Sequence, residues 1–295
     1  MTRALRTPEE RFEALPEFGF APHYREAGGL RLAHVDEGDG APVVFLHGEP
    51  TWSFLWRRVI PPLRDAGYRC IAPDLAGFGR SDKPVELGWY SYDRHTELVG
   101  GLLADLDLRA ATLVVHDWGG PIGLRLAVEQ PERVGRVVAM NTGVATGQQR
   151  MSDAWRTFAA FVERTEDLPV SLLVRRGCAT DPGDEVAAAY DAPFAEPAAK
   201  AGARAFPRLV AQEPDAPGAE TGRRVLAALR EDRRPMLLLW GEEDPALPLA
   251  LGEAFARTLG REPPRRIAGA SHYLQEDKGA EVGAIIADWL ASDPG

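Results

Sequence analysis

The chain has 295 residues, 45% hydrophobic and 26% charged, which is typical of one large globular domain or two modest ones. Its net charge of −10, from 34 basic and 44 acidic residues, argues against a nucleic-acid or anionic-membrane partner, because both need a basic patch. The two cysteines, Cys70 and Cys178, have neither the number nor the spacing of a metal site or a disulfide framework.

The N-terminal stretch MTRALRTPEERFEALPEFGF lacks the apolar core of a secretory signal. The sequence also has no run of about 18 apolar residues that could span a bilayer. We therefore expect a cytoplasmic protein.

Short β-rich runs then alternate with helical patterns, which predicts an α/β fold with a mostly parallel central sheet and helices on both faces. We expect 30–38 to be the first strand and 41–48 to lie at the sheet centre. The further expected strands are 68–75, 111–117, 136–142, 235–241 and 264–270, and the expected helices are 53–66, 92–107, 119–130 and 279–291.

The interval from 144 to 230 interrupts this alternation. It has no convincing buried strand, and its alanine-rich helical pieces are broken by prolines and glycines. Because such a length is too great for a loop, we interpret it as a helical cap over the sheet. The predicted organisation is a core of 1–143 and 231–295 with the cap at 144–230.

Polar turns follow several of the expected strands. In a parallel α/β sheet, ligands bind beyond the carboxyl ends of the strands, so these turns should meet at one edge. The turns are HGEPT at 47–51, DLAGFGRSD at 74–82, and those carrying Asp117, Asp244 and His272.

The chain order Asp117, Asp244, His272 matches the nucleophile, acid and histidine of α/β hydrolases. Their nucleophile sits in a G-x-S-x-G turn, and HDWGG at 116–120 places Asp117 at the serine position. The alternative for Asp117 is a helix N-cap. Asp244 is favoured as the acid because Asn141, at the other position used for it, is neutral, although its neighbours Glu242 and Glu243 leave the choice open.

Six motifs resemble the haloalkane dehalogenases, and the resemblance covers about residues 20 to 290. The closest branch is the one with Glu in its H-G-E-P motif. Epoxide hydrolases and fluoroacetate dehalogenases share the scaffold and the aspartate turn. The motifs are HGEPTWSFLWR, APDLAGFGRSDKP, VVHDWGG, AAYDAPF, AFPRLVAQ and GASHYLQED.

This resemblance implies hydrolysis of a small apolar haloalkane by a cofactor-free enzyme, which we expect to be a monomer. Asp117 would displace the halide and form an alkyl ester, and His272 would activate water to hydrolyse it. Asp244 would orient the imidazole, and the backbone N–H groups of Glu49 and Trp118 would stabilise the oxyanion.

The leaving halide also needs hydrogen-bond donors, since an unpaired buried anion is costly. Trp118 matches the family's first indole donor. The second is expected twelve residues before Tyr190, where this chain has Cys178, a weak donor. Trp155, the only tryptophan of the cap, is the alternative. The expected cavity-lining side chains are Trp118, Phe158, Phe161, Phe194, Phe206 and Leu247.

Three other functions stay open at this point. An epoxide hydrolase uses the same triad but needs two cap tyrosines, and the cap has only Tyr190. A fluoroacetate-type enzyme would use arginines such as Arg175 and Arg176, but it would have Arg in place of Trp118. A binding protein on a hydrolase scaffold would usually have a broken triad.

Overall fold

The computed structural model describes residues 2–292 and contains an eight-stranded sheet with the order β10-β9-β8-β7-β4-β5-β3-β2. The strands pair in parallel from β10 to β5, and β3 and β2 are antiparallel additions at one edge. The strands are β2 Pro22–Ala27, β3 Leu30–Glu37, β4 Pro42–Leu46, β5 Arg69–Pro73, β7 Ala111–His116, β8 Val134–Met140, β9 Met236–Gly241 and β10 Arg265–Ile267, and the short β1 Ala4–Leu5 pairs with β6 Lys83–Pro84.

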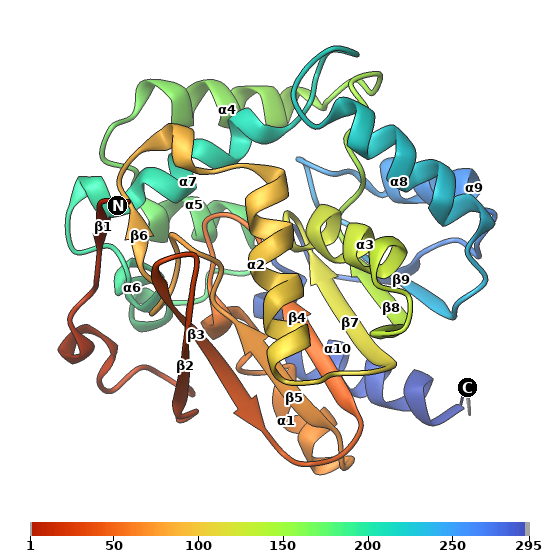
Figure 1. Ribbon diagram of the computed structural model, residues 1–295, viewed down its shortest axis with the longest axis horizontal. Coiled ribbons are helices and arrows are strands. Elements are labelled where there is room, and N and C mark those ends of the chain that lie inside the picture. The colour runs from red at the N-terminus through yellow and green to blue at the C-terminus, as the bar shows by residue number, and fades with distance from the viewer. Residues whose placement is uncertain (1, 293–295) are drawn as a thin grey trace.

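Helices cover both faces of the sheet. The central strand β7 is buried along its whole length, as expected for a parallel strand between two helical layers. The helices α1 Ile60–Asp65 and α10 Leu274–Ser292 pack together, and the other layer holds α2 Tyr92–Asp105, α3 Gly119–Glu129, α8 Ala219–Glu231 and α9 Leu249–Leu259 (Figure 1). This arrangement confirms the predicted α/β-hydrolase fold class.

The predicted strands are all present, but three details of the prediction were wrong. The strand at 30–37 is not the first, because the polar, half-exposed β2 and the two-residue β1 precede it. The expected helix 53–66 is split into a 3-10 turn, Ser53–Trp56, and the short α1. The helix α9 was not predicted at all. Edge strands carry little hydrophobic periodicity, which explains why β2 was not predicted from the sequence.

Further helices lie between β8 and β9, across the carboxyl end of the sheet (Figure 1). The N-terminal segment also contacts this region, since Thr7 Oγ1 donates to Pro193 O at 2.6 Å and Arg11 Nε donates to Ala192 O at 2.7 Å. The cap boundaries 144 and 230 stay a prediction. The helices that precede α8 are α4 Asp153–Arg164, α5 Val170–Gly177, α6 Asp184–Asp191 and α7 Ala201–Ala205.

The turn between β7 and α3 is exceptionally close to the neighbouring strand. A Cβ atom on Gly119 would lie 2.0 Å from the carbonyl oxygen of Leu46, at the end of β4. Only glycine permits this approach, and it brings the first turn of α3 against the loop that follows β4. The side chain of Asp117 is thereby placed beside the 47–51 loop.

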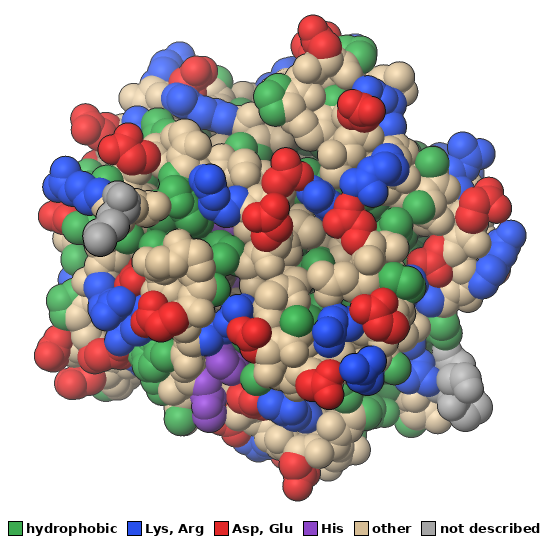
Figure 2. Space-filling view, viewed as in Figure 1, with side chains coloured by type: hydrophobic (Ala, Val, Ile, Leu, Met, Phe, Trp, Pro, Cys, Tyr) green, Lys and Arg blue, Asp and Glu red, His purple; other side chains and the backbone are tan. Residues whose placement is uncertain are grey.

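The described helices are all too short or too polar to cross a membrane. On the face seen in Figure 2, Lys and Arg side chains are interspersed with Asp and Glu side chains.

Candidate functional site

Asp117 occupies a strained turn that directs its carboxylate away from helix α3. Its φ is +48°, in the left-handed region that non-glycine residues rarely adopt. The N-cap of α3 is Trp118, with no side-chain cap bond, so the N-cap alternative for Asp117 is wrong. Instead Asp117 Oδ1 accepts the backbone N–H of Glu49 at 2.9 Å, and Thr142 Oγ1 donates to the Asp117 carbonyl at 2.6 Å.

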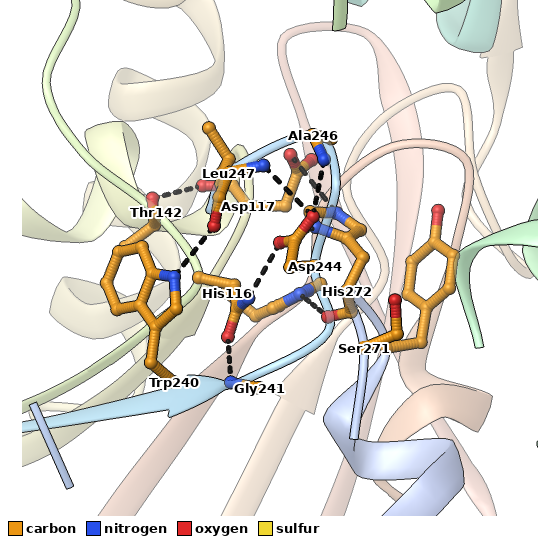
Figure 3. A network of polar contacts seen from close by, with 12 residues as sticks. His116, Asp117, Thr142, Trp240, Gly241, Asp244, Ala246, Leu247, Ser271 and His272 are labelled. Carbon is orange, nitrogen blue, oxygen red and sulfur yellow. Dashed lines mark hydrogen bonds and ion pairs between the residues drawn. The ribbon is translucent and has the colours of Figure 1, made fainter. Parts of the chain in front are cut away.

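His272 lies between two carboxylates. Its Nδ1 is 2.8 Å from Asp244 Oδ2, and its Nε2 is 3.7 Å from Asp117 Oδ2. The backbone carbonyl of His272 is also 2.8 Å from His116 Nε2 (Figure 3). The three residues expected to cooperate are therefore brought together from three separate turns.

Asp244 is held by a full set of donors. Asn141 Nδ2 donates to Oδ2 at 2.7 Å, and the N–H groups of Ala246 and Leu247 donate to Oδ1 at 2.8 and 2.9 Å (Figure 3). The neighbouring Glu242 and Glu243 are exposed. Of the three adjacent acids, only Asp244 therefore points toward the histidine.

The three ionisable groups have different pKa shifts. Burial raises the pKa of Asp117, although His272 and the N–H groups of Trp118 and Glu49 oppose the shift. Burial also opposes ionisation of Asp244, but His272, Leu247 and Asn141 outweigh it and lower its pKa to about 2. Burial lowers the pKa of His272, but Asp244 and then Asp117 raise it to about 8. Asp244 is thus held as an anion and His272 can change its charge near neutral pH, while burial makes ionisation of Asp117 more costly than in water.

A cavity of about 660 Å³ opens beside Asp117, within the usual range for a small-molecule site. Its walls come from the turns at the carboxyl end of the sheet and from the segments between β8 and β9, and most of the side chains are apolar. They include Asp117, Trp118, Ala145, Met151, Ala154, Trp155, Phe158, Phe161, Leu173, Val210, Leu226, Leu247, His272 and Tyr273.

The expectation for the cavity wall was wrong at Phe194 and Phe206, which do not line it. Phe206 is fully buried behind Trp118, with ring centroids 5.3 Å apart. Cys178 also lies outside the wall, and its thiol donates to Val174 O at 3.3 Å, within its own helix. Trp155, in contrast, faces the cavity.

Sequence reasoning assigned a role only to the backbone of Glu49, but its side chain also faces the cavity. The side chain is buried, and Oε1 has no hydrogen-bond partner among residues 2–292. Burial and the charge of Asp117 raise its pKa well above the ordinary value. The available signal was a glutamate in the H-G-E-P motif, in a turn expected to lie beside Asp117.

Some of the side chains that two of the alternative functions need are engaged elsewhere. The hydroxyl of Tyr190 donates to Glu276, and Tyr190 does not line the cavity. Arg175 pairs with Asp181 and Asp184, whereas Arg176 lines the cavity. No group of three or more His, Cys, Asp or Glu side chains that could hold a metal ion occurs among the described residues.

Comparison with known proteins gives a consistent result. Residues 41–279 match the family model described as alpha/beta hydrolase fold. A haloalkane dehalogenase of Mycolicibacterium paratuberculosis is 44% identical, with 97% of both chains covered. One from Psychrobacter cryohalolentis is 39% identical, with 99% of both chains covered. The structure of the haloalkane dehalogenase DpaA from Paraglaciecola agarilytica, described as tetrameric, superposes with a TM-score of 0.90 at 37% identity, covering 99% of both chains.

Proposed function

The chain belongs to the haloalkane dehalogenases of the α/β-hydrolase fold, and on that basis we propose that Asp117, His272 and Asp244 are its catalytic triad. The enzyme hydrolyses the carbon–halogen bond of a haloalkane with water, releasing an alcohol and a halide. The observation that carries the assignment is the position of His272, 2.8 Å from Asp244 and 3.7 Å from Asp117.

The first step is attack by Asp117 Oδ2 on the halogen-bearing carbon. Oδ1 accepts the Glu49 N–H, whereas Oδ2 faces His272. A C–O bond forms as the C–X bond breaks, and the halide leaves with the bonding electron pair. The product is an alkyl ester of Asp117, which water can cleave, whereas an ether on serine would be inert.

The second step is hydrolysis of this ester. Neutral His272 takes a proton from water at Nε2 while the water oxygen attacks Asp117 Cγ. Asp244 stabilises the resulting imidazolium through its bond to Nδ1. The negative charge that develops on Oδ1 is stabilised by the N–H groups of Glu49 and Trp118, which act as an oxyanion hole. Collapse then breaks the Cγ–Oδ2 bond, and the imidazolium gives its proton to the leaving alkoxide oxygen, which releases the alcohol and restores neutral His272. Asp117 finally loses its carboxyl proton to solvent and is again a carboxylate.

The leaving halide is held by the indoles of Trp118 and Trp155. Both side chains line the cavity, whereas Cys178 does not. Two N–H donors in a dry, apolar cavity offset the cost of burying the anion. The substrates are small apolar haloalkanes, because most of the remaining wall is aliphatic or aromatic.

The organisation of the molecule supports a cap at 144–230 over a core of 1–143 and 231–295, because the helices between β8 and β9 lie across the carboxyl end of the sheet.

A monomeric state and a cytoplasmic location stay predictions; the DpaA relative is described as tetrameric. Sedimentation velocity of the purified protein distinguishes a monomer from that assembly.

Replacing the base should trap the ester. In His272→Phe, Asp117 still attacks, but no base activates water, so incubation with a 1-bromoalkane should add the mass of the alkyl group to the intact protein. Asp117→Asn, which lacks the nucleophile, is the matched control and should gain no mass. An adduct with an epoxide but with no bromoalkane would overturn the assignment.

Trp155→Phe should weaken inhibition by bromide about tenfold or more, because one charge-assisted hydrogen bond contributes about 1.5–3 kcal/mol. Cys178→Ala is the control and should leave the bromide inhibition constant unchanged. The reverse pattern would assign the second halide contact to the thiol.

Esterification removes the charge of Asp117, which helps to hold the pKa of His272 at about 8 in the free enzyme. His272 must be neutral to act as base, so the hydrolysis rate should rise with pH through a pKa lower than 8. Single-turnover decay of the ester between pH 5 and 9 measures this value. A pKa equal to or above that of the free enzyme would contradict the proposed charge coupling.

A further inference from the structure

The segment that follows His272 joins the catalytic loop to the cap. Asp277 Oδ2 accepts the N–H of Ser271 at 2.9 Å and the N–H of Ala179 at 3.0 Å. Its Oδ1 accepts the N–H of Thr180 at 2.9 Å. One carboxylate therefore binds the residue directly before His272 and two residues of the cap, which are nearly 100 positions away in the chain.

The residue after His272 is fixed to the same part of the cap. The N–H of Tyr273 donates to Gly177 O at 3.1 Å. A Cβ atom on Gly177 would lie 2.3 Å from the Tyr273 ring, so the ring lies directly against the cap backbone. The hydroxyl of Tyr273 also donates to Glu49 O at 3.3 Å, in the loop of the proposed oxyanion hole.

A buried ionic cluster next to Asp277 anchors the start of α10. Arg57 Nη2 donates to Glu276 Oε2 at 2.8 Å, and Tyr190 of the cap donates to the same carboxylate. The Arg57 and Glu276 side chains are 0% and 1% exposed. Loss of either partner would leave a buried charge unpaired, so this cluster is a structural element whose removal would threaten the fold itself. Asp277 is only half-buried, and removing it tests the connection with less risk to folding.

We propose that Asp277 is a positioning residue that couples cap residues 177–180 to His272 and keeps the imidazole in place for hydrolysis of the alkyl ester. This inference rests on the proposed function. Three of the hydrogen bonds that hold the backbone around His272 are those of Asp277 at Ser271 N, Gly177 at Tyr273 N, and His116 at the His272 carbonyl. Two of the three depend on contacts that involve the cap.

The two chemical steps depend differently on this anchorage. Asp117 is held by the β7–α3 turn, Glu49 and Thr142, and none of these contacts involves Asp277. Halide displacement requires no base, whereas ester hydrolysis requires Nε2 of His272 at a defined distance from water. A small displacement of a catalytic group can reduce a rate by up to about 10²-fold. Loosening the His272 loop should therefore slow the second step selectively.

The test is pre-steady-state kinetics with a 1-bromoalkane. For Asp277→Ala, the rate of the initial bromide burst should stay within about twofold of the unmodified enzyme, and the later hydrolysis rate should fall about tenfold. The ester should accumulate, and KM should fall together with kcat. Asp277→Asn keeps an oxygen for Ser271 and Ala179, so it should recover much of the hydrolysis rate.

Asp191→Ala is the matched control, because Asp191 Oδ1 also accepts a backbone N–H, that of Ser171 at 3.1 Å, but entirely within the cap. It should leave the ratio of the two rates unchanged. Equal slowing of both steps in Asp277→Ala, or a lower active fraction with normal rates, would overturn the proposal. If that variant does not fold, the same kinetics are measured on Asp277→Ser, whose side chain is too short to bridge Ser271 and residues 179–180, and an unchanged ratio there overturns the proposal. Absence of any ester in His272→Phe would instead refute the proposed function.

Discussion

The site depends on keeping a carboxylate ionised after it has been removed from water. Desolvation costs an ion several kcal/mol, whereas one hydrogen bond to a charged group contributes about 1.5–3 kcal/mol, so no single contact can offset the burial of Asp117. The positive φ at Asp117 lets its carboxylate meet the Glu49 N–H and His272 together. The partial positive charge at the start of α3 adds to these contacts.

The two aspartates of the site have different surroundings, which fit their different proposed roles. Asp244 accepts four hydrogen bonds and has a pKa near 2, so it stays charged and has no free electron pair directed at the substrate. Asp117 has fewer donors, a raised pKa and an open side toward the cavity. In the proposed mechanism, these surroundings suit Asp117 to the role of nucleophile. His272 lies between the two aspartates, and its pKa is expected to fall when esterification neutralises Asp117.

Much of this could be predicted from the sequence, because buried parallel strands and the polar turns after them have strong local patterns. Asp117, Asp244 and His272 follow such strands and lie together as expected. The pairing of Asn141 with Asp244 and the position of Phe206 behind Trp118 could not be predicted, because they depend on how distant segments pack. The helices between β8 and β9 were the least predictable part, because no sheet fixes their register. The family resemblance placed the second halide donor at the position of Cys178, whereas the cavity wall contains Trp155 and not Cys178.

Tracing oxygen through a single turnover tests the covalent role of Asp117 most directly. With enzyme in excess over a bromoalkane in H₂¹⁸O, the alcohol should carry ¹⁶O from Oδ2, and the peptide containing Asp117 should gain ¹⁸O when water opens the ester at Cγ. An alcohol that carries ¹⁸O in the first turnover, with an unlabelled peptide, would show that water attacks the haloalkane directly and would contradict a nucleophilic carboxylate.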